Sequence, residues 1–214
     1  MNKPYLRIIK KPKLKAPTFI GGLPGFGNVG KIAAELLLEF TGAKRFAELY
    51  SPYFSDYVII DQIGVCHLPR YEFYSCQMSD PNLIIATGDL QPSYDEPHAH
   101  YILCTIIFDL ALKLGCRQVI TLGGYPVSTP ELGKIYVAAT SEQMAASLAG
   151  NIGFIYEGGR IAGAAGLLLG LAKIQGVPGA CILGQTTGIM PDRQAALSVF
   201  RYLVRALKLK QTKA

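Results

Sequence analysis

Residues 18–30, TFIGGLPGFGNVG, decide the fold class of this chain. The β-branched and aromatic residues at the start predict a buried strand, and the glycines after it predict a tight turn. Asn28 is a candidate cap for a helix that continues to about Phe40, and Gly42 is its natural left-handed stop. Strand, turn and helix in this order are typical of an α/β sheet protein.

The same alternation of short apolar runs and longer amphipathic ones continues along all 214 residues. Further buried strands are predicted at residues 82–87, 119–122 and 180–183, and helices at 97–114, 161–174 and 193–208. Ser141 is a candidate N-cap, and Asp192 is the predicted cap of the last helix. The first helix has Ile32, Leu36 and Phe40 as its predicted apolar stripe. Residues 64–78 alternate and predict a β-hairpin or arm. We divide the chain into a basic N-terminal segment (1–17), a single α/β domain (18–208) and a short basic tail (209–214).

The net charge of +6 is concentrated at the two ends of the chain. Residues 1–15 carry six basic side chains, residues 198–214 carry five, and neither range has an acidic one. The middle has 21 − 11 = 10 basic and 15 acidic residues, a net charge of −5. A nucleic-acid-binding face more often has a basic stripe interleaved with aromatic residues. We therefore expect solvated basic termini and no nucleic-acid partner.

Composition also bears on the compartment. Half of the residues are hydrophobic and 17% are charged, which excludes a disordered chain. The longest charge-free apolar run, between Arg160 and Lys173, is shorter than the ~18 residues that a membrane span needs. Lysines in the first sixteen residues argue against a signal peptide. Five cysteines without Cys-x-x-Cys spacing indicate reduced thiols, so we expect a cytoplasmic protein.

A Gly-x-Gly-x-x-Gly motif spans Gly25 to Gly30, between a predicted strand and a predicted helix. This is the context in which a dinucleotide pyrophosphate binds at a helix N-terminus. Pro24 before the first glycine, and Glu48 inside a predicted strand and not at its end, favour the alternative of a simple packed turn. Glycine-rich ends follow three further strands, and the carboxyl ends of parallel strands form ligand crevices. The candidate ligand-binding residues are Gly25, Gly27, Asn28, Gly30, Asp89, Thr186 and Thr187.

Residues for catalysis or metal binding are not grouped in the sequence. His98 and His100 point to different sides of their predicted helix, and His67 lies beside Cys66 with no partner implied. No Gly-x-Ser-x-Gly nucleophile motif occurs. We expect no catalytic residue, no metal and no cofactor. A ligand-binding, phosphorylase-like or nucleotide-dependent enzyme that uses the glycine-rich crevice stays the alternative.

The predicted helix at residues 161–174 has Gly163, Gly166 and Gly170 on one face. Glycine weakens a helix by up to ~1 kcal/mol relative to alanine, which indicates that another backbone approaches this face. Packing of the helix on the sheet is the favoured explanation, and a subunit contact is the alternative.

Seven motifs in order carry a resemblance to a known family. They are the glycine-rich segment 21–31, ELYSP at 48–52, LPRYEFY at 68–74, IIATGD at 84–89, ITLGGY at 120–125, IAGAAGLLLG at 161–170 and LGQTTG at 183–188. Together they cover nearly the whole chain, about residues 18–207. This set resembles the proteasome assembly chaperone family of the second-subunit type, in its archaeal form.

The resemblance implies a single three-layer α/β domain with a mostly parallel central sheet, similar to purine nucleoside phosphorylases. It implies a non-enzymatic homo-oligomer that helps proteasome α-subunits assemble. Family members that dock on the proteasome commonly end in a hydrophobic residue, a tyrosine and one further residue. Here the last residues are Gln211-Thr-Lys-Ala214, so docking through this tail is not expected.

The predicted hairpin is the candidate contact surface of such an oligomer, because exposed aromatic residues favour protein contacts. The candidate interface residues are Leu68, Arg70, Tyr71, Glu72, Phe73 and Tyr74.

Overall fold

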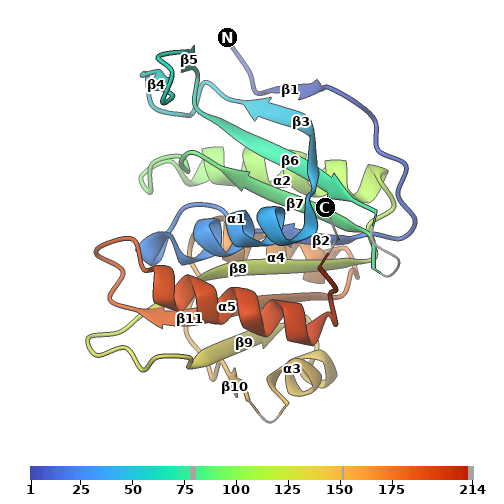
Figure 1. Ribbon diagram of the computed structural model, residues 1–214, viewed down its shortest axis with the longest axis vertical. Helices are drawn as coiled ribbons and strands as arrows, with labels where there is room; N and C mark the ends of the chain where they lie inside the picture. Colours follow the sequence, from blue (N-terminus) through green and yellow to red (C-terminus); the bar gives the residue numbers. More distant parts are fainter. Residues whose placement is uncertain (78–80, 151, 212–214) are drawn as a thin grey trace.

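The computed structural model describes residues 1–77, 81–150 and 152–211. In this part of the chain, nine strands form one sheet with the order β1-β3-β6-β7-β2-β8-β11-β9-β10 (Figure 1). The strands of this sheet are β1 (Tyr5–Ile8), β2 (Thr18–Gly21), β3 (Lys44–Tyr50), β6 (Arg70–Cys76), β7 (Leu83–Gly88), β8 (Gln118–Pro126), β9 (Ile135–Ala139), β10 (Phe154–Ile155) and β11 (Gly179–Thr186). A separate small hairpin consists of β4 (Ile59–Ile60) and β5 (Cys66–His67).

The sheet is mixed, which corrects the expectation of a mostly parallel one. The four central strands β7, β2, β8 and β11 run parallel, and β10 runs parallel to β9. The pairs β1–β3, β3–β6, β6–β7 and β9–β11 are antiparallel. Short local connections allow antiparallel pairing, whereas each parallel neighbour needs a crossover. Parallel pairing therefore occurs among the four central strands and between β9 and β10, which α3 connects.

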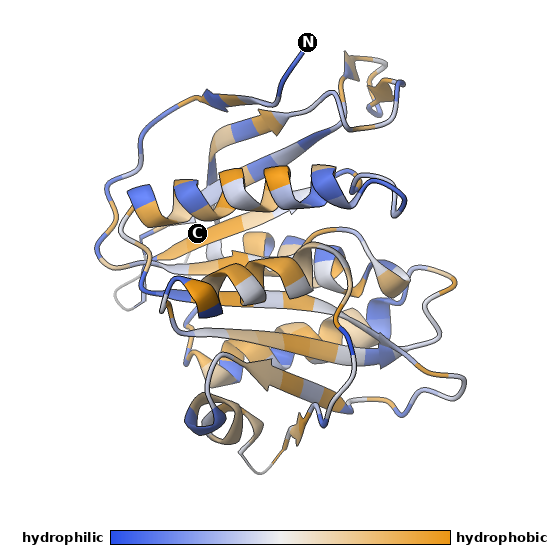
Figure 2. Cartoon of the chain, turned by 180° about the vertical axis from the view of Figure 1, so that it is seen from behind, coloured by the Kyte–Doolittle hydropathy of each residue, from blue (hydrophilic) through white to orange (hydrophobic). Residues whose placement is uncertain are grey.

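Helices cover both faces of the sheet and give three layers (Figure 1). One face carries α1 (Val29–Thr41) and α5 (Arg193–Ala206), and the other carries α2 (Pro97–Lys113) and α4 (Gly163–Ile174). A shorter helix, α3 (Glu142–Ala149), packs beside β9. Each face has its own apolar core, and the central strands are hydrophobic along most of their length (Figure 2). The predicted three-layer α/β domain is confirmed at this level.

Several helix ends lie where the sequence predicts them. Asp192 caps α5, because its carboxylate accepts a hydrogen bond from the Ala195 N–H at 2.9 Å. Ser141 caps α3 in the same way, and α1 ends at Gly42, whose φ is +60°. Asn28 is left-handed, with φ of +49°, and its side chain makes no cap bond within the described chain.

The buried side of α1 is not the predicted stripe. Ile32, Leu36 and Phe40 are half-buried, while Ala33, Ala34 and Leu37 are fully buried against the sheet. Small residues face the strands because the first turn of α1 lies very close to them. The stripe predicted from large apolar side chains instead flanks this contact.

The predicted arm at residues 64–78 is also wrong in its position. Its second half is β6, which lies inside the main sheet between β3 and β7. The projecting hairpin is β4–β5, and it stands away from the body beside the end of β3 (Figure 1). An alternating strand is half-buried whether it belongs to a hairpin or to a sheet, so its pattern does not separate the two.

The two ends of the chain form part of the fold, while their described basic side chains are exposed as predicted. Residues 5–8 form β1 at the sheet edge, and the Arg7 guanidinium lies 3.4 Å from the Glu48 carboxylate. Leu209 is buried against the α1–α5 core. The last residues of the predicted tail, 212–214, lie outside the described residues.

Across the described ranges, none of the helices combines the length and the apolar character required to cross a membrane. Four of the five cysteines are buried and Cys66 is exposed, and all five are free thiols. Burial raises the pKa of the Cys104 and Cys181 thiols to about 12, so neither is a reactive nucleophile at neutral pH.

Candidate functional site: a pocket at the strand ends

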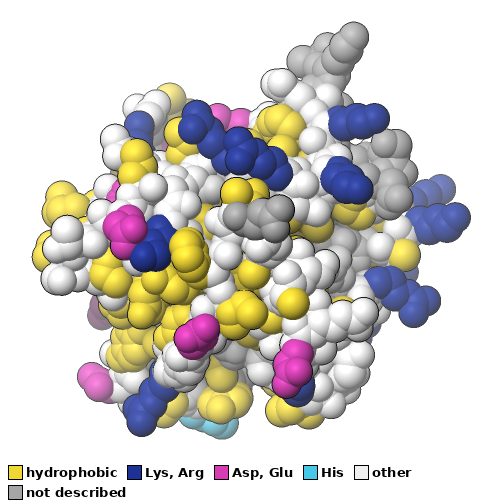
Figure 3. Space-filling model, turned by 90° about the horizontal axis from the view of Figure 1, so that it is seen from below, with side chains coloured by type: hydrophobic (Ala, Val, Ile, Leu, Met, Phe, Trp, Pro, Cys, Tyr) yellow, Lys and Arg dark blue, Asp and Glu magenta, His cyan; other side chains and the backbone are white. Residues whose placement is uncertain are grey.

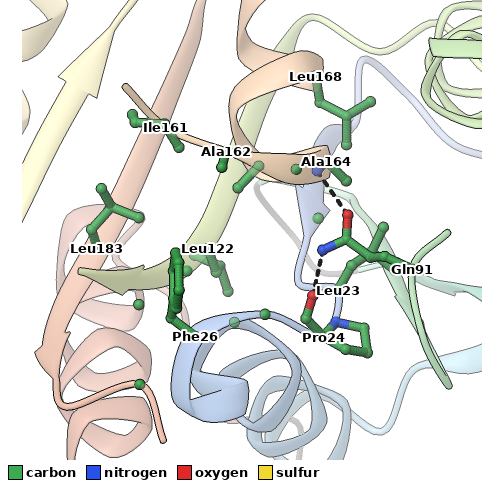
Figure 4. Close-up of a pocket in the computed structure, with 18 of the residues that line it drawn as sticks. Leu23, Pro24, Phe26, Gln91, Leu122, Ile161, Ala162, Ala164, Leu168 and Leu183 are labelled. Carbon is green, nitrogen blue, oxygen red and sulfur yellow. Dashed lines mark hydrogen bonds between the residues drawn. The ribbon is translucent and has the colours of Figure 1, made fainter. Parts of the chain in front are cut away.

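A pocket of about 490 Å³ opens at the carboxyl ends of the four parallel strands. Its position is the usual ligand crevice of an open α/β sheet. Leu23 follows β2, Gln91 follows β7, Leu122 lies on β8 and Leu183 on β11, so every central strand contributes to the wall. The start of α4 closes the pocket from the other side (Figure 4).

Small residues line part of the hollow. Gly123 and Gly124 lie near the end of β8, and Ala162, Gly163 and Ala164 form the start of α4. The surrounding side chains are mostly apolar: Leu23, Pro24, Phe26, Leu122, Ile161, Leu168 and Leu183.

Gln91 is the central polar group of this pocket (Figure 4). Its Oε1 accepts a hydrogen bond from the Ala164 N–H at 2.9 Å, and its Nε2 donates to the Pro24 carbonyl. Ala162 precedes α4 and has no side-chain oxygen to cap the helix, so Gln91 supplies an acceptor from a distant loop. A Cβ at Gly163, whose φ is +69°, would lie 3.0 Å from Oε1, so glycine leaves the amide its place.

Charged and titratable groups lie around the pocket. Arg160 is exposed at the rim, two residues before Ala162. The Asp89 carboxylate accepts a hydrogen bond from the Arg70 N–H at 3.0 Å, which directs it toward β6. His100 lines the pocket from α2 and is only 8% exposed, and its Nε2 has no hydrogen-bond partner in the described part of the chain.

The Gly25–Gly30 turn does not offer the free backbone N–H groups that a nucleotide site requires, because three of them are bonded within the protein. The Gly27 N–H donates to the Gly188 carbonyl, the Asn28 N–H to Gly25 and the Val29 N–H to Phe26. A Cβ at Gly30 would lie 2.3 Å from the Leu122 carbonyl oxygen of β8. These glycines thus bring α1 onto the sheet, and the three N–H groups are bonded within the protein.

The seven candidate ligand-binding residues are only partly brought together. Gly25, Gly30 and Asp89 line the pocket. Gly27 packs against the fully buried Thr186, whose hydroxyl accepts a hydrogen bond from the Gly188 N–H. Asn28 is absent from the wall of this pocket, as are Gly27 and Thr186, and Thr187 lines a separate open depression with Arg193.

The candidate interface residues are divided between the core and a polar sheet face. Tyr71 and Phe73 are 1% and 0% exposed, so the expectation of exposed aromatics is wrong for both. Their alternation with Arg70, Glu72 and Tyr74 places the aromatic pair against α2 and the polar residues on the opposite face. Leu68 lies next to the β4–β5 hairpin and is 50% exposed.

The polar residues of β6 form a charged network with β3. Glu72 is opposite Glu48 in the sheet, and both carboxylates contact Arg45 and Arg70. Burial raises the pKa of Glu72, but hydrogen bonds from Arg45 and Tyr74 and the charge of Arg70 outweigh this, and the net pKa lies below its ordinary value. Every strong charge here has a partner, which indicates a structural network and not a catalytic pair.

Sequence reasoning misses three features of the site. Gln91 and His100 are single polar residues in a loop and a helix, and no motif marks them. The third feature is an aromatic cluster beside the pocket, formed by Tyr125, Tyr136 and Tyr156 from separate elements. The ring centroid of Tyr125 lies 4.7 Å from that of Tyr136 and 5.5 Å from that of Tyr156. The uncapped start of α4 is the signal that predicts an acceptor from elsewhere.

Exposed apolar side chains gather on the β4–β5 hairpin and its flanks. Six large ones lie between residues 57 and 68 and are at least half exposed: Tyr57, Val58, Ile60, Ile63, Val65 and Leu68. Another face, seen from below, shows hydrophobic side chains mainly toward the left and several Lys and Arg side chains along the right (Figure 3). Among the described residues, no group of three or more His, Cys, Asp and Glu is arranged to hold a metal ion.

Known proteins share this architecture over almost its whole length. A structure of Pyrococcus furiosus PbaB, described as an archaeal proteasome activator, superposes with a TM-score of 0.92 and 36% identity, covering 99% of this chain and 92% of that one. Pyrococcus furiosus PbaA, described as an archaeal homologue of proteasome-assembly chaperone, gives a TM-score of 0.81 and 26% identity, covering 97% and 83%. An uncharacterised Methanocaldococcus jannaschii protein is 38% identical over 188 residues, covering 87% of this chain and 72% of the relative.

The family comparison agrees with these structures and with the seven ordered motifs. The PAC2 family model matches residues 19–212. This confirms the resemblance drawn from the sequence, and the chain belongs to the PAC2 family of proteasome assembly chaperone homologues.

Proposed function

We propose that this protein is a non-enzymatic, cytoplasmic proteasome assembly chaperone homologue that acts as a homo-oligomeric scaffold for proteasome α-subunits. The observation that carries the proposal is the likeness to PbaB, at 36% identity over 99% of this chain. The buried thiols and the fully paired Glu48–Glu72 network are consistent with a protein that acts through its surface.

The β4–β5 hairpin is the surface that we propose for self-association. Ile63 at its tip is 83% exposed, and Ile60 and Val65 are 58% and 56% exposed. Exposed apolar side chains that are contiguous mark protein contacts, whereas scattered ones need no explanation. A hairpin that stands away from the body can also reach a second copy without rearranging the domain. This location replaces most of the candidate interface predicted on β6.

Light scattering on a sizing column tests the proposal, first with the protein alone and then with α-subunits from its own source. We expect a homo-oligomer that elutes as a larger complex when the α-subunits are added. Ile63→Asp is expected to reduce the oligomer to smaller species. Ile174→Asp is the matched control, because Ile174 is 79% exposed at the far end of α4.

Two results would contradict parts of this proposal. An oligomer whose mass ignores the α-subunits would remove the scaffold role. An Ile63→Asp variant with the mass of the unaltered protein would remove the hairpin from the self-contact and leave the scaffold role standing.

The alternative, a phosphorylase-like or nucleotide-dependent enzyme in the crevice, has less support. Three N–H groups of the glycine turn are already bonded within the protein, and Thr186 is fully buried. Thermal-shift measurements with nucleotides and nucleosides test it, and a saturable rise of the melting temperature would favour it.

A further inference from the structure

We propose that the pocket at the strand ends binds a small carboxylate with an apolar body, with the carboxylate held between Arg160 and the start of α4. This role is independent of any proteasome partner. Three observations support it: the shape of the pocket, the polarity of one end of it, and a buried histidine whose Nε2 has no hydrogen-bond partner among the described residues.

The volume and walls set the size and character of the ligand. About 490 Å³ lies within the range of small-molecule sites, roughly 300–1,000 Å³. Leucine, isoleucine and phenylalanine side chains surround the hollow, so the body of the ligand must be apolar (Figure 4).

The polar end favours a negative group. The N-terminus of α4, a helix of 12 residues, carries partial positive charge and has no acidic residue in its first turn. Gln91 already bonds to the Ala164 N–H, so a carboxylate here is attracted by the positive end of the helix and does not take this N–H. Arg160 lines the pocket two residues before Ala162 and adds a full positive charge, and a planar guanidinium suits two carboxylate oxygens.

His100 is the second and separate observation. A buried ring nitrogen without a partner costs stability, and such groups are rare unless a missing molecule satisfies them. His100 lines this pocket from α2 and leaves Nε2 without a partner in the described chain. The second oxygen of the ligand's carboxylate would supply one, because it can accept a hydrogen bond from Nε2–H. Asp89 is the one acidic residue among the described lining residues, and the Arg70 N–H holds its carboxylate toward β6.

The test uses octanoate as the probe and octanamide as its neutral counterpart, titrated into the full-length protein by calorimetry. We expect saturable binding of octanoate, at least tenfold tighter than that of octanamide, because only the carboxylate gains a charge-assisted pair. Arg160→Gln should weaken octanoate binding about tenfold and leave octanamide binding unchanged. Arg193→Gln, at an exposed arginine outside this pocket, is the matched control.

A second variant tests the location. Ala162 is exposed at the mouth in an extended conformation, so Ala162→Phe should block entry without disturbing the core. Its binding of octanoate should fall at least tenfold, while its circular dichroism and melting temperature stay unchanged. Three outcomes would overturn the proposal: no saturable octanoate binding, equal binding of octanoate and octanamide, or full binding by Ala162→Phe.

Discussion

Two helices begin with glycine-rich turns at the same edge of the sheet, and they have opposite surroundings. The turn before α1, Gly25–Gly30, lies directly on β8 and β11, and its N–H groups bond to neighbouring carbonyls. The start of α4, residues 163–166, borders a pocket and takes its acceptor from Gln91. The motif associated with nucleotide binding is at the start whose N–H groups are bonded to the protein's own carbonyls, although Gly25 and Gly30 also line the pocket.

The difference shows what a glycine motif reports. Glycine at a helix start means that something approaches the backbone closely, but the motif does not say what approaches. At α1 it is the protein's own chain, with the Leu122 carbonyl against Gly30. At α4 it is a side-chain amide, next to unfilled space. Tertiary contacts decide between these cases, and single substitutions separate them.

Gly30→Ala should have the largest effect. The new Cβ would lie 2.3 Å from the Leu122 carbonyl oxygen, a backbone atom that can move only with its strand. We expect a loss of about 3 kcal/mol in the free energy of unfolding, as for overpacked cores. Urea denaturation measures it as a lower midpoint at unchanged slope. A loss below about 1 kcal/mol would mean that the turn is not closed onto β8.

Gln91→Met should have an intermediate effect on the α4 start. Methionine has a similar length but leaves the Ala164 N–H and the Pro24 carbonyl without their bonds. We expect a loss of about 1–2 kcal/mol, together with faster hydrogen exchange at Ala164. Gln175→Met is the control, because Gln175 is exposed at the other end of α4 and should change stability by less than about 0.5 kcal/mol. An unchanged exchange rate at Ala164 would show that Gln91 is not the cap.

The sequence predicts the elements of this fold better than their arrangement. Helix ends follow local chemistry, so Asp192, Ser141 and Gly42 are recognisable without the structure. Strand pairing is non-local. The alternating β6 was compatible with a free hairpin, and only the arginine contacts that join Glu72 and Glu48 explain why its polar face is stable inside the sheet.

The site follows the same rule. Ligand-facing residues generally lie at the strand ends of α/β sheets. The positions of Gly25, Gly30 and Asp89 after predicted strands are therefore enough to predict that they line the pocket. Thr186 does not line the pocket, because it ends a central strand on which the turn before α1 packs. Gln91 has no local signal, since its role depends on a helix that begins 72 residues later in the chain.

Gly170→Ala should have the smallest effect and the opposite sign. Gly170 lies on α4 with Gly163 and Gly166, and the sequence favoured packing of this glycine face on the sheet. That explanation is wrong for Gly170, because a Cβ there would meet no atom within 4 Å in the described chain apart from its own neighbours and helix backbone. Alanine in an open helix position should raise the free energy of unfolding by up to ~1 kcal/mol. Urea denaturation measures this gain on the same scale as the loss in Gly30→Ala.

The same variant tests the second explanation for the glycine face, a subunit contact. If the backbone of a neighbouring copy approaches Gly170, the added methyl group collides with it, and Gly170→Ala lowers the oligomer mass in light scattering. If the mass is unchanged and stability rises, the glycine has no close neighbour in the assembly either. Gly163 and Gly166 then keep their own local reasons, the Gln91 amide and the Ile161 carbonyl, and the three glycines do not form one functional face.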